Sequence, residues 1–271
     1  MPDRVTLGIL CVVAISLACG CGDSGSSADD DSGSGASSSS GTAPPPGPSA
    51  EGWRSAYADG GVGVRCGDSA QDMEAAGAPS LTVGETTLFV GYQQDGQNQN
   101  PVVARFDAGE PVWCAHHETE GPDGRALGIT WDGGEAAYVV YTIVGGGSSL
   151  EGKDGWLSAY APGAISGGGP KVSYVGRVLT NDGGLESGSF IIAVKMDGKV
   201  NSHNPADAVT VLQDGDIEFR GGSAHKPIDA NGQQSMDCTD YPFDTRYRLS
   251  PDLSSLSCAD ATNCVAEQPC E

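Results

Sequence analysis

Hydrophobic and polar positions alternate in many short runs along the chain, and Gly, Asp, Asn and Pro separate these runs. Alternation with a period of two predicts β-strands that bury one face. The run Val209–Arg220 is the clearest hairpin, because Asp214 and Gly215 interrupt it where a tight turn belongs. Further strands are predicted at Leu88–Tyr92, Tyr138–Tyr141 and Phe190–Val194. The pattern therefore predicts an all-β fold.

The strand pattern recurs along the chain. Residues 52–62 and 155–165 are identical at seven of eleven positions, and each copy begins with Gly-Trp. Five strand anchors mark the successive copies, at intervals of 49, 54, 52 and 37 residues: Tyr57, Phe106, Tyr160, Leu212 and Leu249. After each anchor we expect a turn and a second strand, which ends in a cysteine three times, at Cys66, Cys114 and Cys258. The expected unit is a strand, a variable Gly-rich loop and a hairpin.

Antiparallel units of about 40–50 residues are typical of β-propeller blades. The segment Val90–Tyr92, followed by Arg105–Asp107 and Trp113, resembles the bacterial repeats of many secreted propeller-like proteins. This resemblance implies a β-propeller-like assembly of about five strand-hairpin units over residues 52–258. Residues 259–271 are then a cysteine-containing C-terminal tail. An irregular β-sandwich is the alternative fold.

The first residues predict export. The apolar run Val5–Ala18 is short for a membrane span but suits the core of a signal peptide. The small residues and cysteines that follow resemble the lipobox of bacterial lipoproteins, in which a Cys is diacylated and becomes the mature N-terminus. Cys19 and Cys21 both fit that role, and a plain secretory signal cut near Ala18 is the alternative. The resemblance implies that residues 1–21 are a lipoprotein signal peptide and lipobox.

Residues 22–51 are rich in Ser, Gly, Asp and Pro. Such a segment cannot bury enough apolar surface to offset the entropy of ordering, so we expect a disordered tether. A Gly rather than an Asp follows each candidate lipid Cys, which by analogy with enteric bacteria favours the outer membrane or cell surface over retention at the inner membrane. The predicted location is therefore the cell envelope, with a lipid anchor.

Charge limits what the domain can bind. The chain has 14 Lys and Arg against 36 Asp and Glu, which gives a formal net charge of −22. Such a chain repels phosphate backbones and anionic lipid surfaces. We expect no nucleic-acid partner, and we expect the membrane to be reached through the N-terminal lipid.

The nine cysteines agree with export. Cys11 leaves with the signal peptide, and one of Cys19 and Cys21 takes lipid, with Cys21 favoured because no odd thiol then remains. Six cysteines are left for disulfides in an oxidising compartment: Cys66, Cys114, Cys238, Cys258, Cys264 and Cys270. Zinc is the weaker alternative, because the last three are separated by five residues each. We predict a Cys66–Cys114 disulfide, since both residues end equivalent strands.

The four histidines are the candidate metal ligands: His116, His117, His203 and His225. In a ring of repeats, corresponding loops converge on one face, and imidazole suits Cu, Zn or Ni. The alternative is that each histidine is a solvated loop residue. The stretch from Gly91 to Val103, with Trp113 near the adjacent histidines, resembles the methanotroph surface copper-binding proteins of the MopE/CorA type. That resemblance implies Cu(I) held by His116 or His117, by His203, and by Trp113 oxidised to kynurenine.

Calcium is a lesser possibility. The acidic turns 181–183, 214–216 and 229–232 offer hard oxygen ligands, although Asn-Asp-Gly and Asp-Gly are also ordinary turn sequences.

The sequence contains no G-x-S-x-G nucleophile elbow, H-E-x-x-H zinc helix or P-loop, so an enzyme is not favoured. The leading hypothesis is an envelope-anchored surface lipoprotein whose non-catalytic β domain binds a protein, a glycan or an ion. One alternative is a copper(I)-binding surface protein. The other is a propeller-type hydrolase whose acidic residues line a central channel.

Overall fold

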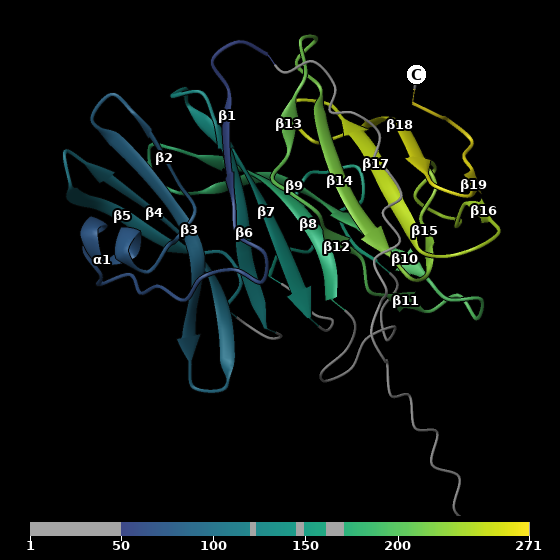
Figure 1. Ribbon diagram of the computed structural model, residues 1–271, viewed down its shortest axis with the longest axis horizontal. Helices are drawn as coiled ribbons and strands as arrows, with labels where there is room; N and C mark the ends of the chain where they lie inside the picture. The colour runs from purple at the N-terminus through teal and green to yellow at the C-terminus, as the bar shows by residue number, and fades with distance from the viewer. Residues whose placement is uncertain (1–49, 120–122, 145–148, 161–170, 271) are drawn as a thin grey trace, which may run out of the picture. The chain divides into compact units, whose positions relative to one another are not determined.

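The computed structural model describes residues 50–119, 123–144, 149–160 and 171–270 (Figure 1). Within these ranges the chain is all-β, with nineteen strands in antiparallel sheets and one helix of six residues. The predicted all-β class is therefore confirmed. No described helix is long and apolar enough to cross a membrane. The lipobox cysteines Cys19 and Cys21 and nearly all of the predicted tether lie outside the described residues.

Sheet I is a four-stranded meander. It consists, in spatial order, of β2 (Ser80–Val83), β3 (Thr86–Asp95), β4 (Asn98–Asp107) and β5 (Glu110–His116). Asp95 pairs with Asn98 at the tip of the β3–β4 hairpin, where Gly96 has a φ of +60° that favours glycine. The predicted strand Leu88–Tyr92 lies within β3.

The helix α1 (Ala70–Ala75) closes one face of sheet I. It begins at Ser69, whose hydroxyl accepts from the Asp72 N–H while the Asp72 carboxylate accepts from the Ser69 N–H, which forms a capping box. Met73 is fully buried in a small apolar cluster with Phe89 and Phe106. The alternate residues of the same strands, such as Val90, join the main core instead.

Sheet II is the central layer of the domain. It consists, in spatial order, of β1 (Arg54–Tyr57), β6 (Gly124–Trp131), β7 (Ala136–Val144), β8 (Lys171–Leu179) and β9 (Leu185–Ile191). Every residue of β7 except Val144 is buried. A strand reads as a continuous buried run when both faces of its sheet are covered. Sheet II therefore has a neighbour on each side.

Sheet III and two small sheets complete the domain. Sheet III consists of β12 (Asn204–Pro205), β13 (Thr210–Val211), β14 (Ile217–Ser223), β17 (Phe243–Leu249) and β18 (Leu256–Ala261). The small sheets consist of β10 (Ala193–Val194), β11 (Val200–Asn201) and β15 (Lys226–Pro227), and of β16 (Asp237–Cys238) and β19 (Cys264–Val265).

Hydrogen bonds show which sheet covers which face of sheet II. On the sheet I side, the Trp113 indole and Arg105 both donate to the Thr180 carbonyl, at 3.0 and 2.8 Å. On the sheet III side, Thr130 Oγ1 donates to the Val209 carbonyl at 2.6 Å, and Tyr57 Oη donates to the carbonyl of Pro205. The main apolar core runs through all three layers, which Figure 1 shows in blue, teal and yellow-green.

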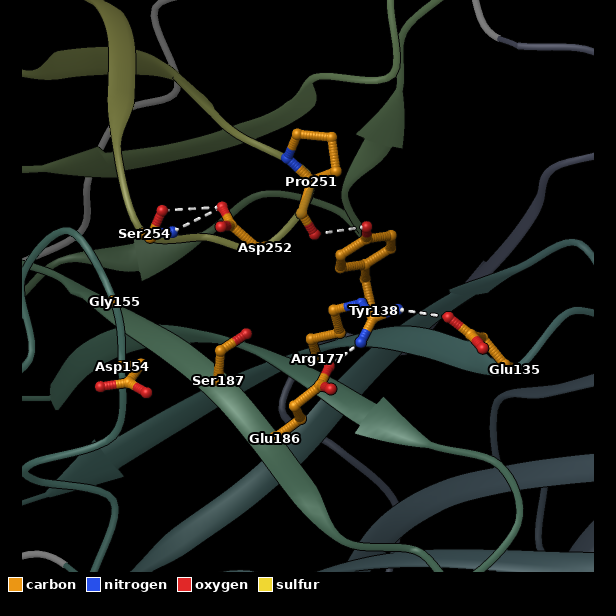
Figure 2. Close-up of a pocket in the computed structure, with 10 residues that line it drawn as sticks. All are labelled: Glu135, Tyr138, Asp154, Gly155, Arg177, Glu186, Ser187, Pro251, Asp252 and Ser254. Carbon is orange, nitrogen blue, oxygen red and sulfur yellow. Dashed lines mark hydrogen bonds and ion pairs between the residues drawn. The ribbon is translucent and has the colours of Figure 1, made fainter.

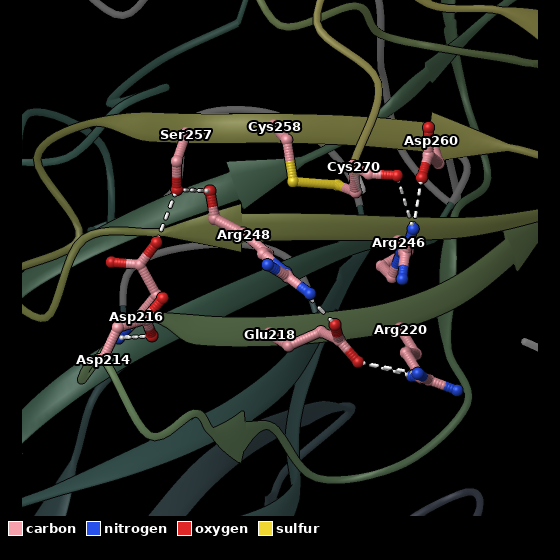
Figure 3. Close-up of polar contacts among 10 residues, drawn as sticks. All are labelled: Asp214, Asp216, Glu218, Arg220, Arg246, Arg248, Ser257, Cys258, Asp260 and Cys270. Carbon is pink, nitrogen blue, oxygen red and sulfur yellow. Dashed lines mark hydrogen bonds and ion pairs between the residues drawn. A yellow bond between two sulfur atoms is a disulfide. The ribbon is translucent and has the colours of Figure 1, made fainter. Parts of the chain in front are cut away.

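A charged network stabilises the outer part of sheet III (Figure 3). The Glu218 side chain is fully buried and accepts hydrogen bonds from Arg220 at 2.7 Å and Arg248 at 3.4 Å. Arg246 donates to the carboxylate of Asp260 and to the carbonyl of Cys270. The Arg246 bond to Cys270 and the Cys258–Cys270 disulfide hold the C-terminal segment on the sheet.

All six predicted disulfide cysteines are paired, as Cys66–Cys114, Cys238–Cys264 and Cys258–Cys270. The Cys66–Cys114 prediction is confirmed, but its stated reason is wrong. Cys66 lies outside the named strands, and its segment joins sheet I through an isolated bridge from Gly63 to Tyr92 and a hydrogen bond from the Cys66 N–H to the Gln93 side chain.

The alignment of repeats into equivalent units is only partly right. The hairpins β4–β5, β13–β14 and β17–β18 form as the pattern predicts. The two near-identical Gly-Trp segments differ, because residues 54–57 form β1 beside β6, whereas residues 155–160 contain no strand and run beside β9. The Phe190 N–H donates to the Leu157 carbonyl, but the Leu157 N–H turns to the hydroxyl of Ser189. The two copies thus flank opposite edges of one sheet, and no sheet in the described residues closes on itself.

The aromatic cluster on sheet II gives a stability prediction. Phe190 is fully buried, and its ring meets those of Tyr174 and Tyr160 edge to face, with centroids 4.8 and 4.9 Å apart. Phe190→Ala should lower the free energy of unfolding by about 3–5 kcal/mol, measured by urea denaturation. Val112→Ala, at a side chain that is 49% exposed, serves as the control and should change it by less than about 0.5 kcal/mol. Equal effects would contradict the assignment of this cluster to the core.

Candidate functional site

His117 joins sheet I to sheet II. Its Nε2 lies 2.8 Å from the Gly183 carbonyl, which can only accept, so Nε2 carries the proton. Its Nδ1 then accepts from the hydroxyl of Tyr141, at 2.6 Å. Burial lowers the pKa of His117, so the ring is neutral. Both ring nitrogens are therefore occupied within the fold.

His203 plays the matching part between sheets II and III. Ser173 Oγ donates to the His203 carbonyl at 2.8 Å, so His203 Nδ1 must donate to that same hydroxyl oxygen, 3.0 Å away. His203 Nε2 then accepts from Thr245 Oγ1 at 2.9 Å. The side chain is fully buried, and burial lowers its pKa to about 3. His203 does lie in a loop, between β11 and β12, but the expectation that it is solvated is wrong, because it is buried.

The other candidate metal ligands, His116, His225 and Trp113, do not form a cluster either. His116 Nε2 lies 3.4 Å from Sγ of the disulfide-bonded Cys66, and burial lowers the pKa of the half-buried His225. The Trp113 indole packs near Gly183 and donates to the Thr180 carbonyl, so the structure brings Trp113 and His117 to the same turn. The described residues contain no group of three or more His, Cys, Asp or Glu that could hold a metal.

These contacts do not fit the copper ligands that the resemblance implies. Copper needs nitrogen lone pairs that point to a common centre, whereas His117 and His203 use theirs to accept hydrogen bonds from Tyr141 and Thr245. Two of the three acidic turns are ordinary turns as well, because Asp182 and Asp214 accept from the backbone N–H two residues later. In the third, Asp229 accepts from the backbone N–H groups of Ala230 and Glu267.

A polar cleft of about 730 Å³ opens beside sheet II, and sequence reasoning did not find it (Figure 2). Its floor is a row of cross-strand partners: Tyr138 of β7 pairs with Arg177 of β8, which pairs with Ser187 of β9. Its other walls are residues 154–155 and the β17–β18 turn, to whose Pro251 carbonyl Tyr138 Oη donates at 2.7 Å. Only the strand register brings these residues together.

Carboxylates dominate the cleft. Arg177 forms ion pairs with Glu135 and Glu186. Asp252 accepts hydrogen bonds from Ser250 and from the backbone and hydroxyl of Ser254, and these bonds lower its pKa, the Ser250 bond most. The carboxylate of Asp252 is therefore ionised at neutral pH.

Two polar groups of the cleft have no partner in the described structure. Ser187 is only 5% exposed, and its buried hydroxyl has no hydrogen-bond partner among the described residues. Figure 2 shows it pointing from β9 into the cleft. The neighbouring Asp154, which is bridged to Ser187 through the backbone, is exposed, and its carboxylate forms no hydrogen bond or ion pair with any described residue.

The buried histidines give a prediction for pH dependence. Because His203 titrates near 3 in the folded protein and at its ordinary 6.5 in the unfolded chain, only the unfolded chain gains this proton as the pH falls below 6.5. The free energy of unfolding is therefore highest above pH 6.5. By pH 5, protonation of His203 in the unfolded chain should lower it by about 2 kcal/mol. Burial also lowers the pKa of His117, so this residue likewise makes the protein less stable as the pH falls.

Urea unfolding at pH 7 and pH 5 measures this loss. His203→Gln should flatten the pH dependence, whereas His225→Gln, at a half-buried residue with a smaller lowering of the pKa, should change it much less. If His203→Gln does not fold, NMR titration of the wild-type protein gives the answer, and a His203 ring that gains a proton above pH 5 would contradict the prediction.

The cleft thus offers polar side chains that the fold leaves unused, whereas His117 and His203, two of the four histidines singled out by sequence, are held inside the fold. No protein-family model, curated protein or solved structure matches this chain.

Proposed function

We propose that the chain is an envelope-anchored lipoprotein whose β domain is a non-catalytic binding scaffold, with the cleft over Tyr138, Arg177 and Ser187 as its binding site. One observation carries the proposal, namely the buried, unpaired hydroxyl of Ser187 beside the unpaired carboxylate of Asp154. A buried hydroxyl without a partner costs about 1–3 kcal/mol, and a ligand that hydrogen-bonds to it offsets that cost.

The state of the carboxylates supports binding over hydrolysis. General acid catalysis requires a carboxyl group that keeps its proton near neutral pH. Arg177 instead pairs with Glu135 and Glu186, and hydrogen bonds lower the pKa of Asp252. The imidazoles of His117 and His203 are not free for acid–base catalysis, because each accepts a hydrogen bond inside the fold.

Two features support the envelope location. The lipobox-like residues around Cys19 and Cys21 follow an apolar run, and the domain carries three disulfides, which form in oxidising compartments. The radial, propeller-like order of the sheets stays a prediction. The covering of both faces of sheet II supports it, because every blade of a propeller is covered in this way.

Lipid attachment is tested by metabolic labelling. When the full chain is expressed in a bacterial host with radiolabelled palmitate, Cys21→Ser should abolish incorporation into the protein. Cys19→Ser should retain it. The opposite result would assign the lipid to Cys19, and labelling that survives the double variant would contradict the lipoprotein proposal.

The binding role is tested by calorimetry on the full-length, detergent-solubilised protein with three probes: chitotriose, citrate and spermidine. We expect saturable binding of at least one probe, and Ser254→Trp should abolish it by filling the cleft from its exposed wall. Gln97→Trp, at an exposed position in the β3–β4 turn, is the matched control and should bind as wild type. No binding of any probe, or an equal effect of both variants, would contradict the proposal.

A further inference from the structure

The charges of the cleft select the sign of its ligand. Four carboxylates line it, and Arg177 is the single cation among its ten lining residues. Glu135 and Glu186 already pair with Arg177, so the charges of Asp154 and Asp252 remain without a cation. A cleft lined by uncompensated charge of one sign concentrates ligands of the opposite sign. Anions are disfavoured for the same reason.

The position of the unpaired groups fits an ammonium ion. The backbones of Asp154 and Ser187 are bridged, so the free carboxylate and the unpaired hydroxyl come from adjacent positions. A primary ammonium carries three N–H donors and no acceptor, so it can donate to the carboxylate and to Ser187 Oγ at once. Asp252, on the opposite wall, accepts its hydrogen bonds from Ser250 and Ser254 through Oδ1, which leaves Oδ2 for a second ammonium.

Other ligand classes fit less well. A metal ion needs ligands within one coordination sphere, and the described residues provide no group of three or more carboxylates, histidines or cysteines for one. Sugars are commonly held by an exposed aromatic face in addition to hydrogen bonds. The one aromatic residue in the lining, Tyr138, is only 5% exposed, and its hydroxyl is bound to Pro251.

We infer that the cleft binds an organic cation in which primary ammonium groups are spaced along a flexible aliphatic chain, one at Asp154 and Ser187 and another at Asp252. The inference rests on the binding role proposed above and names its ligand class. A free polyamine and the lysine side chains of a peptide share this chemistry.

The test titrates the full-length protein with spermidine and, separately, with the peptide Lys-Lys-Lys. Asp154→Asn should weaken the binding of either cation about tenfold, because it removes a charged acceptor. The control is Asp95→Asn, which makes the same charge change at an exposed residue outside the cleft and should weaken binding less than about twofold.

Ser187→Ala separates binding from structure. Because the hydroxyl has no partner in the described protein, its removal should leave the melting temperature unchanged or raise it, and should still weaken spermidine binding several-fold. Tighter binding of spermidine than of the peptide would indicate a free polyamine as the source, and the reverse order would indicate lysines of a protein partner. Both orders support the inference.

Other results would overturn it. Equal weakening by Asp154→Asn and Asp95→Asn would show that the cations follow net charge alone. Calcium alone, binding with the same sensitivity to Asp154→Asn and displacing spermidine, would reassign the cleft to a metal. Chitotriose binding that Ser254→Trp abolishes, without any amine binding, would overturn this inference and leave the proposed binding role standing. The absence of binding by every probe would overturn both.

Discussion

Burial of sheet II on both faces is the constraint on which the rest of the structure depends. Where this layer is closed to water, as along β7, a polar group needs an internal partner, because a buried group without one costs about 1–3 kcal/mol. The fold meets this demand with hydrogen bonds to the neighbouring sheets. Tyr141 is satisfied by His117 from sheet I, and Ser173 by His203 on the side of sheet III. Thr130 reaches the carbonyl of Val209.

The same constraint explains why the histidines misled sequence reasoning. His117 and His203 do converge on one sheet although they are far apart in the chain, as the idea of a common metal site requires. They approach it from opposite faces, however, and each is held by hydroxyl or carbonyl groups of the core. A sequence shows the imidazoles but not the hydroxyls that will face them, so a structural bridge and a metal ligand look alike at that level.

Local features were predicted well, and features set by strand pairing were not. The hairpin over Val209–Arg220 follows from two adjacent turn residues, and the all-β class follows from alternation alone. The prediction that the two Gly-Trp segments form equivalent strands was wrong, because strand pairing decides whether a segment at the edge of a sheet becomes a strand. Arg54–Tyr57 finds β6 as a partner, whereas Leu157 directs its N–H to the side chain of Ser189. Predicting the cleft would have required the register of three strands, since only the register places Tyr138, Arg177 and Ser187 in one row.

That row also shows where the central constraint is relaxed. Ser173 and Arg177 lie on the same face of β8, one turned into the core and the other into the cleft. At the Ser173 end the hydroxyl is paired with His203, whereas at the Arg177 end a charged side chain, 18% exposed, lies beside an unpaired hydroxyl. An alanine at position 187 would avoid that cost without disturbing any hydrogen bond of the described structure. The Tyr174 hydroxyl of β8 is also buried without a partner among the described residues, but it lies against Gly188 inside the sheet, whereas the Ser187 hydroxyl lines the cleft, where the proposed ligand could reach it.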